Sequence, residues 1–175
     1  MPIDSSINFV SINIAVITIS DSRTLTNDTS GDLLEKRIIE AGHHMVKRTI
    51  IPDDVSHIKK TLQIMSKEKE IDCIITTGGT GLTGRDTTPE AVKKIANKQI
   101  DGFGELFRQI SYEKIGTSAI QSRAIAALIN RTYVFCLPGS TNACKDGWDE
   151  ILKYQLDIRH KPCNFVEIMP RLNEK

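Results

Sequence analysis

The sequence predicts a single three-layer α/β domain, in which a mostly parallel central β-sheet lies between two layers of helices. Short apolar runs rich in β-branched residues alternate along the chain with segments whose apolar residues recur every three or four positions. The first pattern is typical of buried parallel strands and the second of amphipathic helices. At 175 residues, with no internal repeat or low-complexity tract, the chain fits one domain with a sizeable core.

We expect the domain to span residues 12–163. Residues 1–11 are interpreted as an N-terminal extension, and residues 164–175 as a C-terminal tail. The domain opens with a β-branched run at residues 12–20, which predicts a first central strand. Residues 21–29 are polar and are expected to form a loop.

The first half of the domain is expected to continue with two helices and two strands in alternation. Gly42 is placed to end the first helix, and Asp53 or Asp54 can cap the second. The predicted elements are a helix over residues 30–41, a strand over 45–51, a helix over 55–65 and a strand over 72–75.

The second half is expected to be richer in helices. A compound helix start follows residue 86: Thr88 can cap with Pro89 at the first helical position, or Thr87 can form a capping box with Glu90. The further predicted elements are an amphipathic helix around residues 103–116, a helix of small residues over 119–128, a strand over 132–137, and a final helix that starts at Ser140 or Thr141.

Charge and hydropathy narrow the classes of function. Lys and Arg (23) nearly balance Asp and Glu (22), so the net charge of +1 provides no basic field for nucleic acid. No apolar run approaches the roughly 18 residues that span a membrane, and the first residues lack the pattern of a signal peptide. We therefore expect a cytoplasmic protein that binds neither nucleic acid nor membranes.

The four cysteines predict no metal site. Cys73, Cys136, Cys144 and Cys163 show neither CxxC spacing nor the histidine pattern of a zinc site. We expect structural roles for all four.

The most informative segment is a glycine-rich loop, residues 76–86, which directly follows the predicted strand over residues 72–75. Four glycines within seven residues cost stability unless the backbone needs them. A glycine-rich turn after a parallel strand leaves amide N–H groups free to converge on an anion, usually phosphate. The loop ends at Asp86, and a carboxylate beside phosphate is reasonable when a divalent cation lies between them.

Two familiar phosphate-binding motifs match this loop only in part. The spacing of Gly79, Gly81 and Gly84 fits the dinucleotide fingerprint, but that fingerprint belongs at the first strand and leads straight into a helix. Gly79 and Gly84 also have the spacing of a P-loop, yet Arg85 and Asp86 occupy the positions of its Lys and Ser/Thr. We reject both motifs. Without the dinucleotide fingerprint, we also reject the hypothesis that the protein is an unrelated dinucleotide-dependent oxidoreductase.

Four strand ends carry polar or glycine-bearing sequence. Because the carboxyl ends of parallel strands meet at one edge of a sheet, these segments could line a single pocket there. Ordinary turns would explain any one of them, but less well all four together. The segments are residues 20–22, 52–54, 78–86 and 138–141.

Asp53 and Asp86 together suggest a magnesium site. Mg²⁺ is typically held by one or two carboxylates together with substrate phosphates and water. Nucleotidyl transfer needs such a cation to offset charge that develops on the phosphates. The alternative is that Asp53 is only a helix cap and Asp86 only a turn residue. The residues alone leave the two interpretations nearly even.

At these residues the chain resembles the molybdopterin-binding family of molybdenum cofactor synthesis proteins. The resemblance covers residues 12–163. The segments that carry it are Thr77-Gly78-Gly79-Thr80-Gly81, Asp86-x-x-Pro89-Glu90-Ala91, Gly102-Phe103-Gly104-Glu105-x-Phe107-Arg108, Ile115-Gly116-Thr117-Ser118, Gln121-Ser122-Arg123-Ala124 and Pro138-Gly139-Ser140-Thr141.

The resemblance implies a three-layer α/β fold that assembles as homotrimers, or as hexamers of two trimers. It implies binding of molybdopterin, a pterin with a dithiolene and a terminal phosphate. Adenylyltransferase members transfer AMP from Mg-ATP to that phosphate. Mg²⁺ would be the cofactor, ATP and molybdopterin the substrates, and other molybdenum cofactor synthesis proteins are partners that the resemblance allows.

The resemblance also assigns site residues. Asp53 and Asp86 match the two functional aspartates and are expected to act in catalysis and to hold the metal. The expected substrate- and nucleotide-binding residues are Thr77, Gly78, Gly79, Thr80 and Gly81 in the glycine loop, Pro138, Gly139 and Ser140 after the late strand, and Ser20, Asp21 and Arg123.

One position departs from the family pattern. Adenylyltransferase members usually have Pro-Gly-x-Pro where this chain has Thr141, which keeps an N–H group and a hydroxyl that proline lacks. A second hypothesis follows: a non-catalytic protein that carries molybdopterin or scaffolds its pathway. Retention of both Asp53 and Asp86 favours the enzyme.

Overall fold

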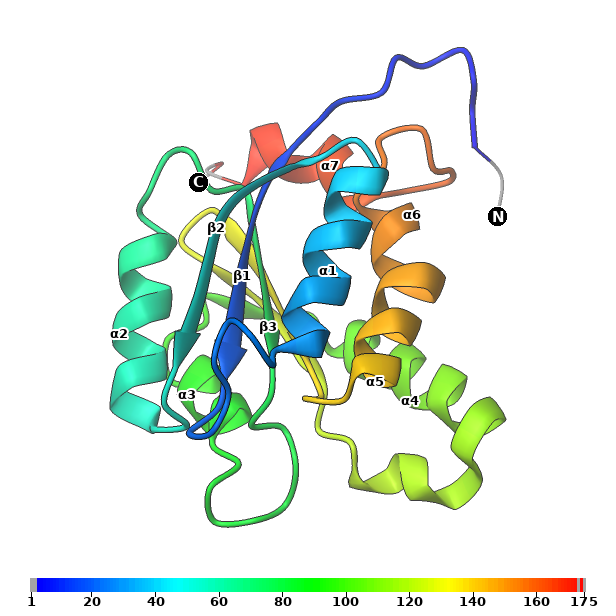
Figure 1. Ribbon diagram of the computed structural model, residues 1–175. Helices are drawn as coiled ribbons and strands as arrows, with labels where there is room; N and C mark the ends of the chain where they lie inside the picture. The colour runs from blue at the N-terminus through cyan, green and yellow to red at the C-terminus, as the bar shows by residue number, and fades with distance from the viewer. Residues whose placement is uncertain (1–2, 173, 175) are drawn as a thin grey trace.

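The structure is a computed structural model that describes residues 3–172 and residue 174. Within this part of the chain, a six-stranded sheet forms the centre of the molecule (Figure 1). Four strands are parallel to one another: β1 (Asn13–Ile19), β2 (His44–Ile51), β3 (Cys73–Thr77) and β6 (Thr132–Leu137). Two antiparallel pairings add β5 (Ile125–Ile129) beside β6 and β4 (Lys98–Gln99) beside β5. The strand order is β2-β1-β3-β6-β5-β4, which confirms the mostly parallel sheet.

Helices cover both faces of the sheet, as Figure 1 shows. One face carries α2 (Val55–Met65) and α3 (Thr88–Lys93). The other carries α1 (Thr29–Glu40), α4 (Asp101–Ile115) and α5 (Thr141–Asp146), and α5 runs on through the π-helical turn η2 (Gly147–Leu152) into α6 (Lys153–Gln155). Shorter elements are η1 (Gly116–Gln121), α7 (Phe165–Ile168) and η3 (Met169–Arg171). The three-layer prediction is confirmed.

Two hydrophobic clusters, one on each face, hold the layers together. Successive residues of a strand point to opposite faces, so Val16 of β1 joins the cluster under α1, α4 and α5, while Ile17 joins the cluster under α2 and α3. Phe103 and Phe107 of α4 are buried in the first cluster. The part of α4 around Phe103 and Phe107 is therefore core.

The prediction of a helix over residues 119–128 is wrong. Its first residues lie in η1, and the apolar residues that follow form β5, which makes an antiparallel hairpin with β6. Asn130 at the turn has a φ of +55°, a conformation that asparagine tolerates better than most residues. Cross-strand pairing and burial override the helical preference of the small residues.

Residues outside the predicted domain also contact the core. In the N-terminal extension, the ring of Phe9 lies 5.1 Å from that of His43. Phe165 of α7 lies 4.8 Å from the ring of Tyr133 in β6. The domain limits of 12–163 stay a prediction. The predicted C-terminal tail packs against the core through Phe165 and Val166. Among the helices of the described residues, none has the length and hydropathy needed to span a membrane.

Candidate functional site

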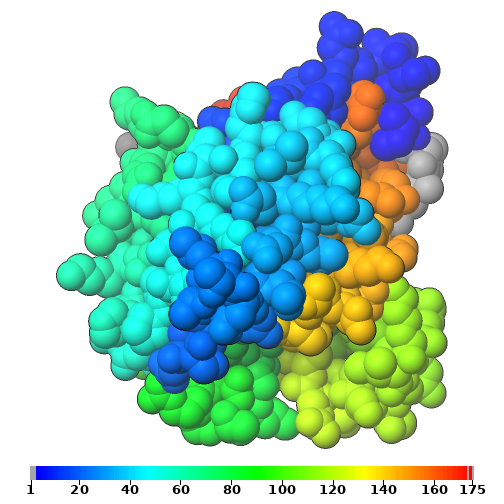
Figure 2. All heavy atoms as spheres, in the orientation of Figure 1, coloured from blue at the N-terminus to red at the C-terminus, as the bar shows by residue number. Residues whose placement is uncertain are grey.

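A cavity of about 570 Å³ opens at the carboxyl edge of the parallel strands. Its walls come from the end of β1 and the loop after it, the glycine loop after β3, the loop after β6, and the facing residues of α1, α4, η1 and α5. In Figure 2 the loop after β1 (blue), the start of α5 (yellow) and the segment after β3 (green) meet on the lower part of the surface. This position matches the general rule for ligand sites in open α/β sheets.

The glycine loop needs its glycines at Gly78 and Gly79. Gly78 has a φ of +110°, and a Cβ there would lie 2.2 Å from the Ile19 carbonyl oxygen. Gly79 has a φ of +64°, and its Cβ would lie 2.4 Å from Thr88 Oγ1. Only glycine combines these conformations with so close an approach of neighbouring chains. The loop is thereby pressed against β1 and α3, with its backbone along the cavity.

The glycine loop presents backbone donors at the cavity. Thr77, Gly78, Gly79, Thr80 and Gly81 all line it. Within the described residues, no protein acceptor is hydrogen-bonded to the N–H groups of Gly79 or Thr80, whereas Gly78 N–H donates to the Leu137 carbonyl. An anion site of this type requires adjacent backbone N–H groups that are not hydrogen-bonded within the protein.

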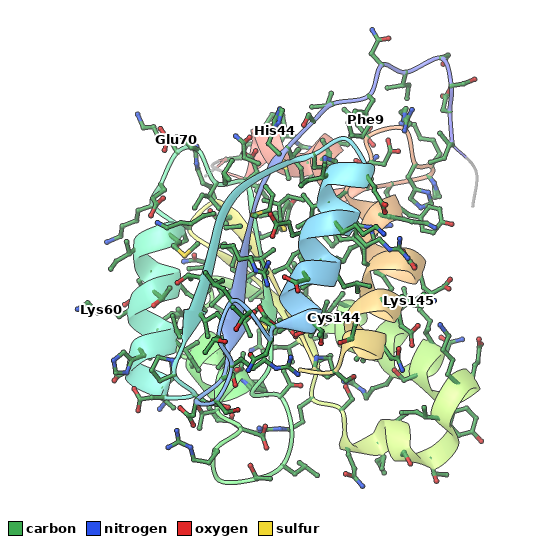
Figure 3. All side chains as sticks on the ribbon, in the orientation of Figure 1. Phe9, His44, Lys60, Glu70, Cys144 and Lys145 are labelled. Carbon is green, nitrogen blue, oxygen red and sulfur yellow. The ribbon has the colours of Figure 1, made fainter. Side chains whose placement is uncertain are left out.

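The loop after β6 completes this wall. Pro138, Gly139 and Ser140 line the cavity, and a Cβ on Gly139 would lie 3.4 Å from Gly78 Cα, so the two loops touch. Ser140 caps α5 by accepting a hydrogen bond from Ala143 N–H at 3.2 Å. The start of this helix therefore faces the cavity with its partial positive charge. In Figure 3, Cys144 lies on the inner side of α5 and Lys145 on its outer side.

Asp86 lies at the cavity, as expected. Its carboxylate accepts hydrogen bonds from the Thr83 N–H (2.9 Å) and hydroxyl (2.6 Å), so it also stabilises the turn over residues 83–86. The Thr83 hydroxyl is the main reason why the pKa of Asp86 lies below its usual range. A Cβ on Gly81 would lie 2.7 Å from Asp86 Oδ2, which places the carboxylate directly beside the glycine loop. Asp86 is thus ionised and available next to the cavity.

Asp53 also lies beside the glycine loop, next to Gly79. It accepts hydrogen bonds from Thr87 N–H (3.3 Å) and Thr87 Oγ1 (3.1 Å), and a Cβ on Gly79 would lie 2.9 Å from its Oδ2. Burial raises the pKa of Asp53, and the negative charges of Asp86 and Asp21 add to that rise. Asp53 is not among the residues that line the cavity. Both aspartates therefore adjoin the glycine loop: Asp86 lies beside Gly81 and lines the cavity, and Asp53 lies beside Gly79 without lining it.

Local hydrogen bonds decide between the earlier cap assignments. Asp54, not Asp53, caps α2, because its carboxylate accepts from the N–H groups of Ser56 and His57 at 3.0 Å. The interpretation of Asp53 as the helix cap is wrong. Thr87 is the residue before α3, but its side chain forms no cap bond, so the capping box with Glu90 is also wrong. The Thr87 hydroxyl instead donates to Asp53.

The remaining predicted site residues divide into two groups. Ser20 lines the cavity. Asp21 does not, because its carboxylate pairs with Arg85 and accepts a hydrogen bond from Asp53 N–H. Arg123 supports the glycine loop from behind: it donates to the carbonyl oxygens of Gly81 and Asp86, both at 2.7 Å, and pairs with Glu90. Arg123 lines a smaller cavity of about 380 Å³ rather than the main one.

The sequence did not reveal several residues of the cavity. They come from β1 and the loop after it, from α1, α4 and α5, and from η1 and the residue after it, and none of them was assigned to the site from the sequence. Two are cations, Arg23 and Lys114, and Lys114 forms an ion pair with Asp146. The others include Thr18, Ser30, Phe107, Ser111, Gln121, Ser122 and Asn142.

The donor set fits a cation that is shared with substrate. Among the described residues there is no group of three or more His, Cys, Asp or Glu side chains able to enclose a metal. Asp53 and Asp86 could supply one or two oxygen ligands, with the others from phosphate and water. That is the usual way in which Mg²⁺ is held beside nucleotides.

Comparison with known proteins agrees with this geometry. A family described as "Probable molybdopterin binding domain" matches residues 15–158. Molybdenum cofactor biosynthesis protein B of Escherichia coli K12 is 42% identical over 160 residues, which cover 91% of this chain and 94% of that protein. The protein of the same name from Bacillus cereus is 44% identical over 142 residues, covering 81% and 84%.

Solved structures show the same relationship. A crystal structure of molybdenum cofactor biosynthesis protein B has a TM-score of 0.85 and 38% identity, and the match covers 95% of this chain and 98% of that one. The tungsten cofactor synthesizing protein MoaB from Pyrococcus furiosus gives a TM-score of 0.69 at 37% identity, covering 81% and 91%. The chain therefore belongs to the molybdopterin-binding family of molybdenum cofactor biosynthesis proteins.

Proposed function

We propose that this protein binds molybdopterin and transfers AMP from Mg-ATP to its terminal phosphate. The observation that carries the proposal is the position of Asp53 and Asp86 beside a glycine loop that lines a cavity and has two N–H groups, of Gly79 and Thr80, with no acceptor among the described residues. A volume of about 570 Å³ lies within the usual range for sites that hold a small-molecule ligand.

Phosphate groups would be held at the wall made by the two loops. The N–H groups of Gly79 and Thr80 and the start of α5 at Ser140 supply partial positive charge. Arg23 and Lys114 add full positive charges at other points of the cavity. This distribution favours a ligand with several negative charges, such as a nucleotide beside a phosphorylated pterin.

The proposed reaction joins two phosphates. An oxygen of the molybdopterin phosphate forms a bond to the α-phosphorus of ATP, the bond from that phosphorus to the β-phosphate bridge breaks, and pyrophosphate leaves. Magnesium, when bound, would neutralise charge that develops on the phosphates. Asp53 and Asp86 would hold it, and the raised pKa of Asp53 supports this, because burial and the charge of Asp86 both favour a counterion there.

The direct test is a product assay. Pure protein is incubated with molybdopterin and Mg-ATP, and adenylylated pterin is measured. Asp86→Asn keeps an oxygen acceptor for Thr83 but removes the negative charge, so we expect turnover to fall by about 100-fold or more while the fold is retained. Asp149→Asn, which breaks only the ion pair with Arg37, is the matched control and should leave turnover unchanged. Normal turnover of Asp86→Asn would exclude its metal role.

A carrier function is the second candidate. It is favoured by the hydrogen bonds of both aspartates to the protein: Asp53 to Thr87 and Asp86 to Thr83. These bonds give the two carboxylates a structural role that needs no metal. Tight binding of molybdopterin without formation of adenylylated product would favour the carrier over the enzyme.

A further inference from the structure

A buried carboxylate lies directly behind the part of the cavity wall that Thr18 and Ser30 form. Asp28, at the start of α1, is fully buried. It accepts hydrogen bonds from Thr18 Oγ1 (2.6 Å), Ser30 Oγ (3.1 Å) and Gly31 N–H (3.1 Å). A helix cap needs only the last of these. The other two come from side chains that line the cavity.

Arg48 of β2 keeps Asp28 ionised. Its guanidinium donates to Asp28 Oδ2 at 3.0 Å and to the Asp28 carbonyl oxygen at 3.1 Å, and it also pairs with Asp32 and Glu35. Burial alone would raise the pKa of Asp28, but the hydrogen bonds from Thr18, Gly31 and Arg48 outweigh it and the pKa is lowered. An ionised carboxylate can only accept hydrogen bonds.

The direction of two hydroxyl protons follows. Since Asp28 cannot donate, Thr18 and Ser30 must, and their protons point away from the cavity. Thr77, the register partner of Thr18 in the sheet, donates to the Pro138 carbonyl at 3.0 Å and accepts from Cys144 Sγ at 3.1 Å, so its hydroxyl is occupied within the protein. The hydroxyls of Thr18 and Ser30 have only lone pairs left for a ligand. This wall therefore accepts hydrogen bonds, whereas the glycine loop donates them.

We propose that Asp28, held by Arg48, is a positioning residue that makes the Thr18–Ser30 wall a recognition site for the N–H edge of an amino-substituted heterocycle. Phosphate is disfavoured there, because its oxygens would meet hydroxyl lone pairs without a donor. The ligand's orientation follows, with its anionic end at the glycine loop and its N–H edge at Thr18 and Ser30. The inference rests on the proposed function, whose two substrates supply such edges in the pterin and in adenine.

Binding titrations with three probes test the proposal. They are 6-hydroxymethylpterin, adenosine and inorganic pyrophosphate, each titrated calorimetrically into the full-length protein. Thr18→Val and Ser30→Ala remove one acceptor each with little change of shape. We expect each variant to bind one of the two heterocycles roughly 5- to 100-fold more weakly, because a ligand N–H is left unpaired, and to bind pyrophosphate as the wild type does. The heterocycle affected identifies which substrate occupies this wall.

Thr76→Val is the matched control. Thr76 is a buried threonine of the same sheet whose hydroxyl has no hydrogen-bond partner among the described residues and does not reach the cavity. This variant should bind all three probes normally. Weaker pyrophosphate binding by Thr18→Val or Ser30→Ala, or unchanged binding of both heterocycles, would overturn the proposal.

Asp28→Asn tests the positioning role itself. Its amide nitrogen cannot accept, so one hydroxyl must turn its proton towards the cavity. We expect weaker heterocycle binding with pyrophosphate binding kept, and an equal loss for all three probes in a folded variant would overturn the role of Asp28. If Asp28→Asn does not fold, Thr18→Val and Ser30→Ala decide. If the wild-type protein binds adenosine but no pterin, the proposed function is contradicted. The Thr18–Ser30 wall can then still be tested with adenosine alone.

Discussion

At Gly78 the backbone and its surroundings leave no room for a side chain. The φ of +110° is unfavourable for every other residue, and a Cβ would lie 2.2 Å from a backbone oxygen of β1. We expect Gly78→Ala to lower the free energy of unfolding by at least about 2 kcal/mol, measured by urea denaturation. Gly84→Ala is the control: no atom lies within 4 Å of its Cβ position, so a change within about 0.5 kcal/mol is expected. Equal stability of both variants would contradict this account of the loop.

Individual residue roles were predictable where a local pattern determines them. The glycine loop and Asp86 follow directly from the order of residues after β3, and the structure places both at the cavity. The choice between Asp53 and Asp54 as helix cap depends on which carboxylate reaches the first N–H groups of α2. The sequence does not reveal this, because the two candidates are adjacent and chemically identical. Arg123 was expected at the ligand, but it reaches backbone oxygens of a loop some 40 positions earlier in the chain, a contact that only the fold creates.

At the scale of elements, the contact between the starts of α1 and α5 explains how Thr141 is accommodated. Thr141 Oγ1 lies 2.8 Å from Thr29 Oγ1. The preceding Ser140 has φ −82° and ψ 141°, an extended conformation that a following proline would also require. Proline is well tolerated at the first position of a helix.

Thr141→Pro therefore tests whether this departure from the family pattern alters the site. We expect the unfolding free energy to change by no more than about 1 kcal/mol and adenylyl transfer to persist in the product assay. Thr141→Val is the control, since it removes the same hydroxyl but keeps the N–H group. A loss of binding in Thr141→Pro alone would show that the Thr141 N–H itself contacts the ligand.

The elements themselves were predictable to different degrees. β1, β3 and β6 lie in the middle of the sheet and have the continuous apolar runs that identify buried strands, whereas β2 is an edge strand that was recognised from its β-branched residues. β5 was mistaken for a helix because its alanines suit both structures, and its partner strand follows it. The missed signal was the Asn130-Arg131 pair between two apolar runs, which favours a hairpin. The two residues of β4 are too few for any pattern.

At the scale of the whole molecule, large apolar side chains remain exposed on α4 and η1. They are Leu106, Tyr112, Ile115 and Ile120. Exposed apolar surface commonly marks a site of association. We propose that copies of this chain associate through these two elements, as the trimer or hexamer that the resemblance implies. In sedimentation velocity, Ile120→Lys should lower the mass of the assembly, while Ile64→Lys on the exposed side of α2 should not. A monomeric wild type would rule out this role for the face.

The stability of the whole molecule should also depend on pH through His43. Its ring is buried between Phe9 and Trp148, and its Nδ1 accepts a hydrogen bond from Ile12 N–H at 3.3 Å, which requires the neutral form. Burial lowers the pKa of His43 from 6.5 to about 4, partly offset by the charge of Asp157. The unfolded chain therefore takes up a proton at a higher pH than the folded protein does.

The sign of the effect follows from this difference. The contribution of His43 is complete above pH 6.5 and is lost as the pH falls towards about 4, by up to about 3 kcal/mol. Urea denaturation across this range should show the slope in the wild type and a shallower one in His43→Gln, whose side chain does not titrate. His44→Gln, at the exposed neighbouring position, should keep the wild-type slope. An unchanged slope in His43→Gln would mean that the pKa of His43 is the same in the folded and the unfolded chain, which would contradict this account.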